Sequence, residues 1–373
     1  MTNKIYKYNF LIVGGGLIGT LAGLQLRKNG YKVLVIDKNI KRTNDKRTLA
    51  VNANSKDFLM KLGLWKKLKN VPQKINKIII KDFMNKDPLI FENKKEEMGN
   101  VIFNSELLDL ARKQLKKINS LIEIKMFDLK QLFESKVVKI NNNNYSFNHV
   151  ILSFGKNFSD NDLIKKFSFP SSHHAFVGFF DHSVNHDQIA YEIFTQRGPL
   201  AVLPSPNKKT NSSTFIYSTK DKLSSSDISK LIKKNFTETH GKIHLKNFAG
   251  QFSIQPHITK DTLHKFFLIG DTLRSIHPVA GQGWNLGIKD IETLSSLLDG
   301  YNLSDKDLVK KYSQLRTIES AGYLSFTTII NYMYENRNPF SNLIVKSAYN
   351  SFKNLSFLRD VFIQQAMGRL KLI

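Results

Sequence analysis

The sequence predicts an α/β protein in which a parallel-sheet domain is interleaved with an antiparallel-sheet domain and followed by C-terminal helices. Three observations predict this class: a strand–turn–helix–strand unit at the N-terminus, a run of strand patterns with one helix between residues 167 and 253, and helical periodicity after residue 304. We expect the parallel-sheet domain at 1–72, 99–160 and 255–303, the antiparallel-sheet domain at 73–98 and 161–254, and the helical region at 304–373.

The N-terminal unit begins with a short apolar strand, 9–13, followed by a glycine turn and a helix that Gly30 ends. Val33–Ile36 forms the second strand, which completes the unit. The same periodicities predict further helices at 58–68, 105–118, 227–236 and 283–298, and further strands at 75–80, 89–91, 150–152, 175–180, 188–195, 200–203, 214–219 and 266–269.

The composition restricts the chemistry. A chain of 373 residues with 41% hydrophobic residues is long enough for two or three domains. It has no cysteine, which excludes disulfides, thiolate metal sites, iron–sulfur clusters and cysteine nucleophiles, so a redox function needs a bound cofactor. No stretch approaches the roughly 18 to 20 apolar residues of a membrane span, and no signal peptide is evident. We therefore expect a cytoplasmic protein.

The chain is strongly basic, with 56 Lys and Arg against 31 Asp and Glu and a formal net charge of +25. Such a charge can indicate nucleic-acid binding. Here the basic residues are scattered, no nucleic-acid-binding motif is present, and the abundance of Lys, Asn, Ile and Phe is typical of an AT-rich coding sequence. We expect no nucleic-acid partner and only an attraction to anionic membrane surfaces.

The turn after the first strand carries the pattern Gly14-x-Gly16-Leu17-Ile18-Gly19. Between a strand and a helix, this pattern predicts a Rossmann-like dinucleotide site. Gly14 permits the tight turn, Gly16 lets a pyrophosphate approach the backbone, and Gly19 lets helix and strand pack closely. Free N–H groups at the helix start then face the phosphates.

The end of the second strand supplies the other half of this site. Asp37, with Lys38 beside it, lies eighteen residues past the last glycine, where a carboxylate can accept hydrogen bonds from ribose hydroxyls. We expect both residues to contact the cofactor. This unit alone does not distinguish FAD from NAD.

A second pattern lies far along the chain. Gly270-Asp271 ends a strand, and residues 276–287, Ile-His-Pro-Val-Ala-Gly-Gln-Gly-Trp-Asn-Leu-Gly, run from a loop into a helix. In these residues the sequence resembles the ubiquinone-biosynthesis hydroxylase family, within the class A flavoprotein aromatic monooxygenases. The resemblance implies a fold like that of para-hydroxybenzoate hydroxylase, with FAD in the parallel-sheet domain.

The resemblance also implies which residues hold FAD. Gly270 and Asp271 would lie at the ribityl chain, and the loop 278–283 would lie against the isoalloxazine ring. Backbone N–H groups at the start of the following helix would stabilise negative charge on the reduced ring. The expected contacts in this segment are Pro278, Ala280, Gly281, Gln282, Gly283, Trp284 and Asn285.

Three further segments match the family. Residues 45–51 match its Asp-x-Arg segment, which implies that Arg47 lies near the pyrophosphate or the flavin and donates a charge-assisted hydrogen bond. Asn104 begins a helix whose first residue contacts the cofactor in the family. Residues 192–204 resemble strands of the substrate domain that face the flavin.

One segment departs from the family. The usual Asp-Gly pair after the strand at 150–152 is replaced by Phe154-Gly155, in a stretch that takes part in NAD(P)H use and FAD binding. The usual His after the Gly-Asp pair is also missing, because the chain continues with 272–274, Thr-Leu-Arg. Reduction by NAD(P)H is therefore the step for which the sequence gives least support.

The resemblance implies an FAD-dependent monooxygenase that hydroxylates the aromatic ring of a polyprenylated phenol or quinol in ubiquinone biosynthesis. NAD(P)H and O2 would be co-substrates, and a flavin C4a-hydroperoxide the oxidant. His277 and Pro278 are the candidate catalytic residues, although hydrogen bonding within the loop is an equally good role for His277. Three alternatives stay open: a catalytically impaired flavoprotein that is a structural partner in a quinone-biosynthesis complex, an FAD hydroxylase of another aromatic substrate, and an NAD-linked dehydrogenase.

Two remaining features concern partners and metals. Residues 340–373 are basic and rich in Phe, Leu and Ile, so they could dock on the inner membrane face or simply pack on the protein body. Peripheral contact with that membrane or with a ubiquinone-biosynthesis complex is therefore an expectation. His182 with His186, and His240 with His244, have the i, i+4 spacing of metal ligands but no clear third ligand, so we expect no metal.

Overall fold

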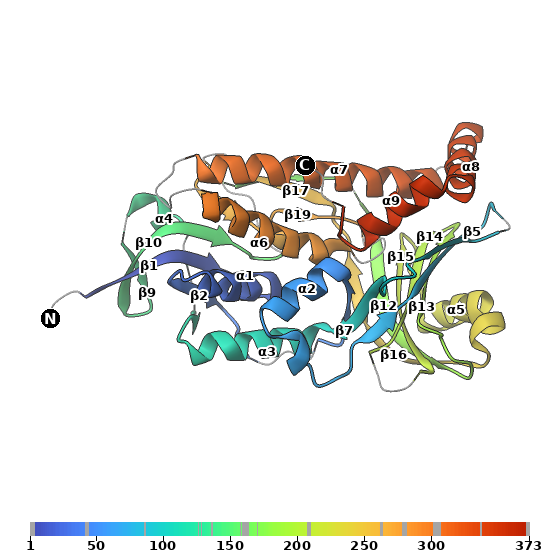
Figure 1. Ribbon diagram of the computed structural model, residues 1–373, viewed down its shortest axis with the longest axis horizontal. Coiled ribbons are helices and arrows are strands. Elements are labelled where there is room, and N and C mark those ends of the chain that lie inside the picture. Colours follow the sequence, from blue (N-terminus) through green and yellow to red (C-terminus); the bar gives the residue numbers. More distant parts are fainter. Residues whose placement is uncertain are drawn as a thin grey trace.

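The structure is a computed structural model that describes residues 4–41, 45–85, 87–125, 127, 129–135, 137–156, 158, 164–169, 171–206, 210–261, 264–277, 282–300, 307–335 and 338–370. It comprises a parallel-sheet domain, an antiparallel-sheet domain beside it, and C-terminal helices that run over both (Figure 1). The α/β fold class that the sequence predicts is confirmed.

The parallel sheet forms the core of the first domain. Its strands follow the order β18-β10-β1-β2-β8 with every neighbouring pair parallel, and β9 pairs antiparallel with β10. Residues 10–13 and 33–36 are buried, as expected for apolar strands covered on both faces. The strands are β1 (Ile5–Val13), β2 (Val33–Asp37), β8 (Leu121–Glu123), β9 (Val138–Ile140), β10 (Asn143–Leu152) and β18 (Phe266–Leu268).

Helices α1 (Leu17–Lys28), α3 (Asn104–Lys117) and α6 (Gln282–Gly300) share one hydrophobic core with this sheet, in which Phe10 and Ile12 of β1 are fully buried. Each helix places its apolar face on the sheet. A short helix, α4 (Gln131–Glu134), lies between β8 and β9 in the chain. The parallel strands end at one edge of the sheet, where Gly14 and Ser153 follow β1 and β10 and Asp37 is the last residue of β2.

One predicted helix is wrong in its bounds. Instead of a helix over 58–68, α2 spans Ala53–Lys61, and a single 3-10 turn, η1, spans Trp65–Lys67. The side chain of Asn52 accepts a hydrogen bond from the Ser55 N–H and so starts α2 early. Gly63 then takes a φ of +67°, which ends the helix in the way that glycine commonly does.

Two small sheets join the domains. In the first, β7 (Gly99–Phe103) pairs antiparallel with both β3 (Thr48–Asn52) and β4 (Gln73–Ile75). In the second, β17 (His257–Asp261) pairs with both β11 (Ile164–Ser168) and β19 (Arg274–Ser275). A 3-10 turn, η2 (Gly270–Thr272), leads into β19.

The antiparallel-sheet domain is built on seven strands in the order β16-β12-β15-β14-β13-β5-β6, of which only the pair β13–β5 is parallel. Helix α5 (Ser225–His240) begins with a Ser224–Asp227 capping box and packs its apolar side on the sheet. The strands are β5 (Lys77–Asp82), β6 (Leu89–Glu92), β12 (His174–His182), β13 (Ile189–Thr195), β14 (Gly198–Pro204), β15 (Ser212–Thr219) and β16 (Ile243–Ser253).

The C-terminal helices are α7 (Leu308–Glu335), α8 (Pro339–Asn354) and α9 (Ser356–Ala366). Helix α7 crosses both domains (Figure 1): the Tyr312 hydroxyl donates to the Leu268 carbonyl at 2.9 Å, and the Tyr334 ring stacks on Phe194 at 4.3 Å. Within the described ranges, none of the helices has the length and apolar character needed to span a membrane.

Candidate active site

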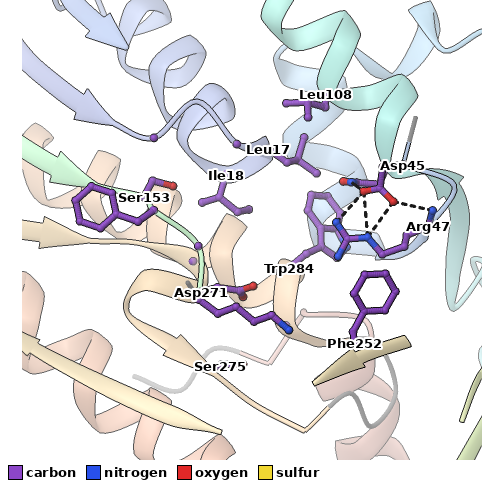
Figure 2. A pocket seen from close by; sticks show the side chains of 18 of the residues that line it. Leu17, Ile18, Asp45, Arg47, Leu108, Ser153, Phe252, Asp271, Ser275 and Trp284 are labelled. Carbon is purple, nitrogen blue, oxygen red and sulfur yellow. Dashed lines mark hydrogen bonds and ion pairs between the residues drawn. The ribbon is translucent and has the colours of Figure 1, made fainter. Parts of the chain in front are cut away.

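A cavity of about 1000 Å³ lies between the two domains. On one side it is lined by the glycine turn after β1, the ends of β2 and β10, and the turn before β19. On the other side it is lined by strands β12, β14, β15 and β16 of the antiparallel sheet. Figure 2 shows the side chains that converge on it from elements far apart in the sequence. Of the predicted cofactor residues, the cavity wall contains Gly14, Gly16, Leu17, Ile18, Asp37, Lys38, Arg47, Asn104, Gly270, Asp271, Gly283 and Trp284.

The glycine turn has the shape that a pyrophosphate needs. Gly14 has a φ of +111°, and a Cβ atom there would lie 2.1 Å from the Ser153 carbonyl oxygen. A Cβ atom on Gly19 would lie 2.0 Å from the Gly14 carbonyl oxygen, so this glycine packs α1 against the turn and does not line the cavity. Gly16 instead borders open space, and no side chain caps the N-terminus of α1. The residues present therefore fit a phosphate group at this helix start.

The glycine turn after β1 is hydrogen-bonded to an arginine that the motif does not include. Arg112 of α3 is buried and donates from Nε and a terminal nitrogen to the Gly15 carbonyl, at 2.9 and 2.7 Å. Its other terminal nitrogen donates to the Lys41 carbonyl at 3.0 Å. The sequence contained one signal for this contact, which is an arginine on the apolar side of a predicted helix. Such a side chain needs buried acceptors.

Asp37 also belongs to this turn. Its carboxylate accepts hydrogen bonds from the Gly15 N–H at 2.5 Å and the Asn39 N–H at 2.7 Å, and it lies at the cavity wall with Lys38. These two bonds fix the carboxylate at the end of β2 without using all of its lone pairs. It can accept further hydrogen bonds from a ligand's hydroxyl groups.

Arg47 lies between Asp45 and Phe252 (Figure 2). Its guanidinium donates to both Asp45 carboxylate oxygens, at 2.7 to 3.0 Å, and its central carbon lies 5.1 Å from the centre of the Phe252 ring. The Asn104 amide also donates to Asp45. Although burial opposes it, these hydrogen bonds lower the pKa of Asp45. The result is a fixed cation at the cavity wall, held by an anion behind it.

Asp271 presents its carboxylate to the cavity from the turn after β18. It is exposed to the cavity, but the protein around it leaves it poorly solvated, and this desolvation raises the pKa of Asp271 against the opposing effect of Lys156, His257, Arg274 and Arg47. Burial lowers the pKa of Lys156, whose Nζ donates to the Ser253 carbonyl at 2.8 Å. This lysine, which links the segment after β10 to the end of β16, was not predicted.

Phe154 occupies the position at which the family usually has an aspartate. Its ring lines the cavity and lies 6.0 Å from the ring of Phe158, which also lines it. The wall is therefore apolar at this point. This side chain offers no hydrogen bond to a nucleotide.

A buried ionic cluster holds the turn that carries Asp271. Asp290 of α6 is fully buried and accepts hydrogen bonds from the Gly270 N–H at 2.8 Å, from Arg274 at 2.9 Å and from Arg316 at 2.7 Å. Glu319 lies against Arg316 and Lys289. The cluster thus joins η2, β19, α6 and α7 at the point where the chain turns toward the cavity.

The start of α6 is anchored to β3. The Trp284 indole N–H and the Asn285 amide both donate to the Ala50 carbonyl at 2.9 Å, and the Asn285 side-chain oxygen accepts from the Asn52 N–H at 3.2 Å. Gly283 and Trp284 line the cavity, whereas Gln282 and Asn285 do not. Pro278, Ala280 and Gly281 lie outside the described residues.

His277 is not part of the cavity wall as described. It is buried behind Ile276, which does line the cavity, and its ring lies 4.9 Å from that of His173. Burial lowers the pKa of His277 to about 4, with His173 acting in the same direction. This histidine is therefore neutral near pH 7.

The histidines that the sequence pairs at i, i+4 lie at the far end of the antiparallel domain. The rings of His182 and His240 are 4.7 Å apart, and that of His186 is 6.1 Å from His182. Burial lowers the pKa of His186 and of His240 to about 4. Among the residues that the structure describes, no three His, Asp or Glu side chains are arranged to hold a metal ion.

Comparison with known proteins gives a family and several relatives. The sequence model of the family described as FAD binding domain matches residues 7–118 and 179–326. The ubiquinone biosynthesis monooxygenase COQ6 of Dictyostelium discoideum is 22% identical, over 98% of this chain and 92% of that protein. The ubiquinone hydroxylase UbiL of Rhodospirillum rubrum is 24% identical, over 97% and 90%. UbiM of Neisseria meningitidis is 22% identical, over 96% and 84%.

Solved structures share the fold. p-Nitrophenol 4-monooxygenase PnpA from Pseudomonas putida superposes with a TM-score of 0.74 at 13% identity, covering 99% of this chain and all of that one. CtdE, solved in complex with FAD, superposes with a TM-score of 0.60 at 14% identity, over 94% of this chain and all of that one. At these identities the likeness concerns the fold.

Proposed function

The chain belongs to the FAD binding domain family, and from this membership we propose that it is an FAD-dependent monooxygenase that hydroxylates the aromatic ring of a polyprenylated phenol or quinol in ubiquinone biosynthesis. The observation that carries the proposal is that one cavity joins the glycine turn and Asp271 to the apolar strands of the antiparallel sheet. The relatives named as ubiquinone hydroxylases and monooxygenases, aligned over nearly the whole chain, support the choice of substrate class.

The chain's residues have distinct roles toward the cofactor. FAD, when bound, supplies the redox chemistry with NAD(P)H and O2 as co-substrates. Gly14 and Gly16 would admit its pyrophosphate to the free N–H groups of α1, and Asp37 would accept hydrogen bonds from its ribose. Gly270 and Asp271 would hold its ribityl chain, and Arg47, Asn104 and the start of α6 would line the rest of its binding site.

The substrate side of the cavity suits an apolar ring and tail. It is formed by Ala175 and Val177 of β12, Leu203 of β14, Ile216 of β15 and Ile254 after β16. Among the described residues on this side, none carries a titratable group. Such a wall excludes water and holds the ring by burial of apolar surface.

The test of this proposal is spectroscopic and chemical. The purified protein, reconstituted with FAD, should show flavin absorbance that bleaches on anaerobic addition of NADPH or NADH. With O2 and a polyprenylated phenol it should form a product heavier by one oxygen atom, detected by mass spectrometry. A protein that cannot be loaded with FAD would overturn the proposal. Flavin that binds but is not reduced would instead favour a structural role in a quinone-biosynthesis complex, for which Phe154 in place of the usual aspartate is the supporting observation.

We further propose peripheral contact with a membrane through the outer faces of α7, α8 and α9. Residues 320–334 of α7 contain no Asp, Glu, Lys or Arg, in a chain whose net charge is +25. The most exposed apolar side chains of these helices are Ile318 (74%), Phe340 (71%), Phe357 (70%), Leu343 (66%) and Tyr332 (61%). Only part of the predicted segment 340–373 contributes, because α9 also packs Phe362 on Phe91 at 4.3 Å.

Sedimentation with vesicles tests this contact. The protein should co-sediment with vesicles that contain anionic lipid, because the basic chain is attracted to anionic surfaces. A smaller fraction of the protein should co-sediment with neutral vesicles. Ile318→Glu combined with Phe357→Glu should abolish sedimentation. Val71→Glu, a change at a residue 64% exposed outside these helices, should not alter it. Equal sedimentation of the two variants would contradict the proposed surface.

A further inference from the structure

The segment 367–369, which follows α9, packs on the residues that join β3 to α2. The Met367 carbonyl accepts a hydrogen bond from the Asn54 N–H at 3.1 Å, and the Met367 side chain is fully buried. Gly368 has a φ of +69°, and a Cβ atom there would lie 2.6 Å from the Asn52 amide nitrogen and 3.0 Å from the Asn54 Cβ. A larger residue at this position would therefore displace one of these side chains.

Polar contacts on both sides fix the same segment. Arg369 forms ion pairs with Asp57 of α2 at 2.6 Å and with Glu96 at 3.2 Å. The Asn93 amide nitrogen lies 3.2 Å from the Met367 sulfur. The segment is thus connected both to the first turns of α2 and to the chain between β6 and β7.

Asn52 and Asn54 in turn contact α6, the helix whose start lies at the candidate active site. The Asn52 N–H donates to the Asn285 side-chain oxygen at 3.2 Å, and the Asn54 amide donates to Glu292 Oε2 at 2.7 Å. Asn285 and Glu292 are about two helical turns apart, so they lie on the same face of α6. Two contacts along one face fix both the rotation of the helix and its position along its axis.

This arrangement reaches the cavity through β3. The strand lies at the edge of its sheet, so it pairs with β7 on one side and leaves the other side to side chains of α6. There the Trp284 indole N–H and the Asn285 amide both donate to the Ala50 carbonyl at 2.9 Å. Ala50 and Trp284 line the cavity, and Figure 2 shows Trp284 among the side chains around it. Gly368 is therefore linked to the cavity wall through Asn52.

We propose that Gly368 and Arg369 are positioning residues of the cofactor site, which fix Trp284 in the cavity wall through the junction of β3 and α2. A side chain of a binding site has to be held within about 0.5 Å of its productive position, and this depends on the residues behind it. The inference rests on the proposed function for the identity of the ligand, FAD. It also means that α9, one of the helices proposed to contact a membrane, leads directly into a support of the cofactor site.

Gly368→Ala is the direct perturbation, and Gly63→Ala is its control. The control adds a Cβ at nearly the same φ, +67°, where no atom lies within 4 Å. Both variants carry a similar backbone strain, so their difference reports the contact with Asn52. In a Trp65→Phe background Trp284 is the only tryptophan. We expect Gly368→Ala, but not Gly63→Ala, to shift the emission of Trp284 in the apoprotein to longer wavelength and to increase its quenching by acrylamide.

Titration of the same variants with FAD tests the effect on the cofactor site. Gly368→Ala should bind FAD at least about threefold more weakly than Gly63→Ala. Adding Asn52→Ser to Gly368→Ala should restore most of this affinity, because serine lacks the amide that the new Cβ would strike and still caps α2. A general loss of stability would not be reversed by a change at Asn52.

A second variant serves if Gly368→Ala does not fold. Arg369→Gln removes ion pairs that are partly exposed and so contribute little to stability. It should shift the Trp284 emission in the same direction and weaken FAD binding by about twofold. Arg359→Gln, which removes the same charge from α9, should do neither. Equal behaviour of these two variants would overturn the proposal.

The remaining outcomes separate this inference from the proposed function. Trp284 emission and FAD affinity that are the same in Gly368→Ala as in Gly63→Ala would overturn the inference. So would a loss of affinity that Asn52→Ser does not restore. A shifted Trp284 emission with unchanged FAD affinity would also overturn it, but would leave the monooxygenase proposal intact. Failure of the unmodified protein to bind FAD would overturn both.

Discussion

Replacing Asp290 by Asn should destabilise the parallel-sheet domain strongly. Asp290 is fully buried, and Arg274 and Arg316, which are 4% and 1% exposed, both donate to it. With Glu319, the cluster has two buried cations and two anions, so Asp290→Asn leaves one buried positive charge uncompensated. Removing one partner of a buried ion pair costs about 3 to 5 kcal/mol. The Gly270 N–H keeps an acceptor in the Asn oxygen, so the loss reports the charge and not that hydrogen bond.

Urea unfolding followed by tryptophan fluorescence measures this loss. Both tryptophans, Trp65 in η1 and Trp284 in α6, belong to the parallel-sheet domain, so the signal reports that domain. Asp299→Asn, an exposed change on the same helix, should stay within about 0.5 kcal/mol of the unmodified protein. Adding Arg274→Met to Asp290→Asn restores the charge balance and should recover part of the loss. A free energy of unfolding for Asp290→Asn within about 1 kcal/mol of the unmodified value would refute the reasoning.

Three further predictions concern the glycine turn, the cavity cation and the histidine cluster. The Cβ of Gly16→Ala would meet no atom within 4 Å, so this variant should have the same free energy of unfolding as the unmodified protein. It should bind FAD at least about tenfold more weakly in a fluorescence titration. Equal affinity would exclude a phosphate at Gly16. Arg47→Ala should weaken FAD binding. It should change the free energy of unfolding by less than about 1 kcal/mol, because the ion pair of Arg47 with Asp45 is partly exposed. A large loss of stability without loss of FAD affinity would show that the residue is structural. Burial depresses the pKa of His186 and His240 from 6.5 to about 4, so the unfolded chain binds more protons than the folded one between these values. The stability that these neutral histidines contribute is then fully present above pH 6.5 and falls as the pH drops toward 4. In thermal unfolding followed by circular dichroism, His240→Phe should make the melting temperature fall less steeply over this pH range. An unchanged dependence on pH would contradict the lowered pKa of His240.

The sequence predicted the parts of the fold that depend on local pattern. Continuous apolar runs such as 33–36 and 150–152 identified the parallel strands, because a strand buried on both faces needs no alternation. Strand β16 was missed because its pairing with β12 has two register irregularities, which interrupt the period of two that identifies a strand. The helix placed at 58–68 was wrong because Gly63 interrupts it, and a glycine adopts positive φ at little cost.

The candidate site, like the fold, could be predicted only where it consists of local motifs. The glycine turn and the Gly270–Asp271 pair are local motifs, and the structure brings both to one cavity. The roles of Arg112, Lys156 and Asp290 depend on carbonyls, carboxylates and cations brought from distant segments, and no spacing in the sequence encodes such contacts. The neighbours of His277 are Asn331 on α7 and His173 just before β12, both far from it in the chain, so its sequence context alone gave no information on what surrounds its ring.

The central position of β1 in its sheet has a consequence for biosynthesis. One edge of β1 pairs with β2 soon after both leave the ribosome, but its other edge pairs with residues 144–152 of β10, and β10 in turn awaits β18 at 266–268. At about 5 to 20 residues per second, translation of the roughly 140 residues that separate β1 from β10 takes on the order of ten seconds. Throughout that time an apolar strand edge on the nascent chain is open to pairing with other chains. The yield of folded protein should therefore depend on translation rate and chaperone supply more than on the stability of the finished molecule.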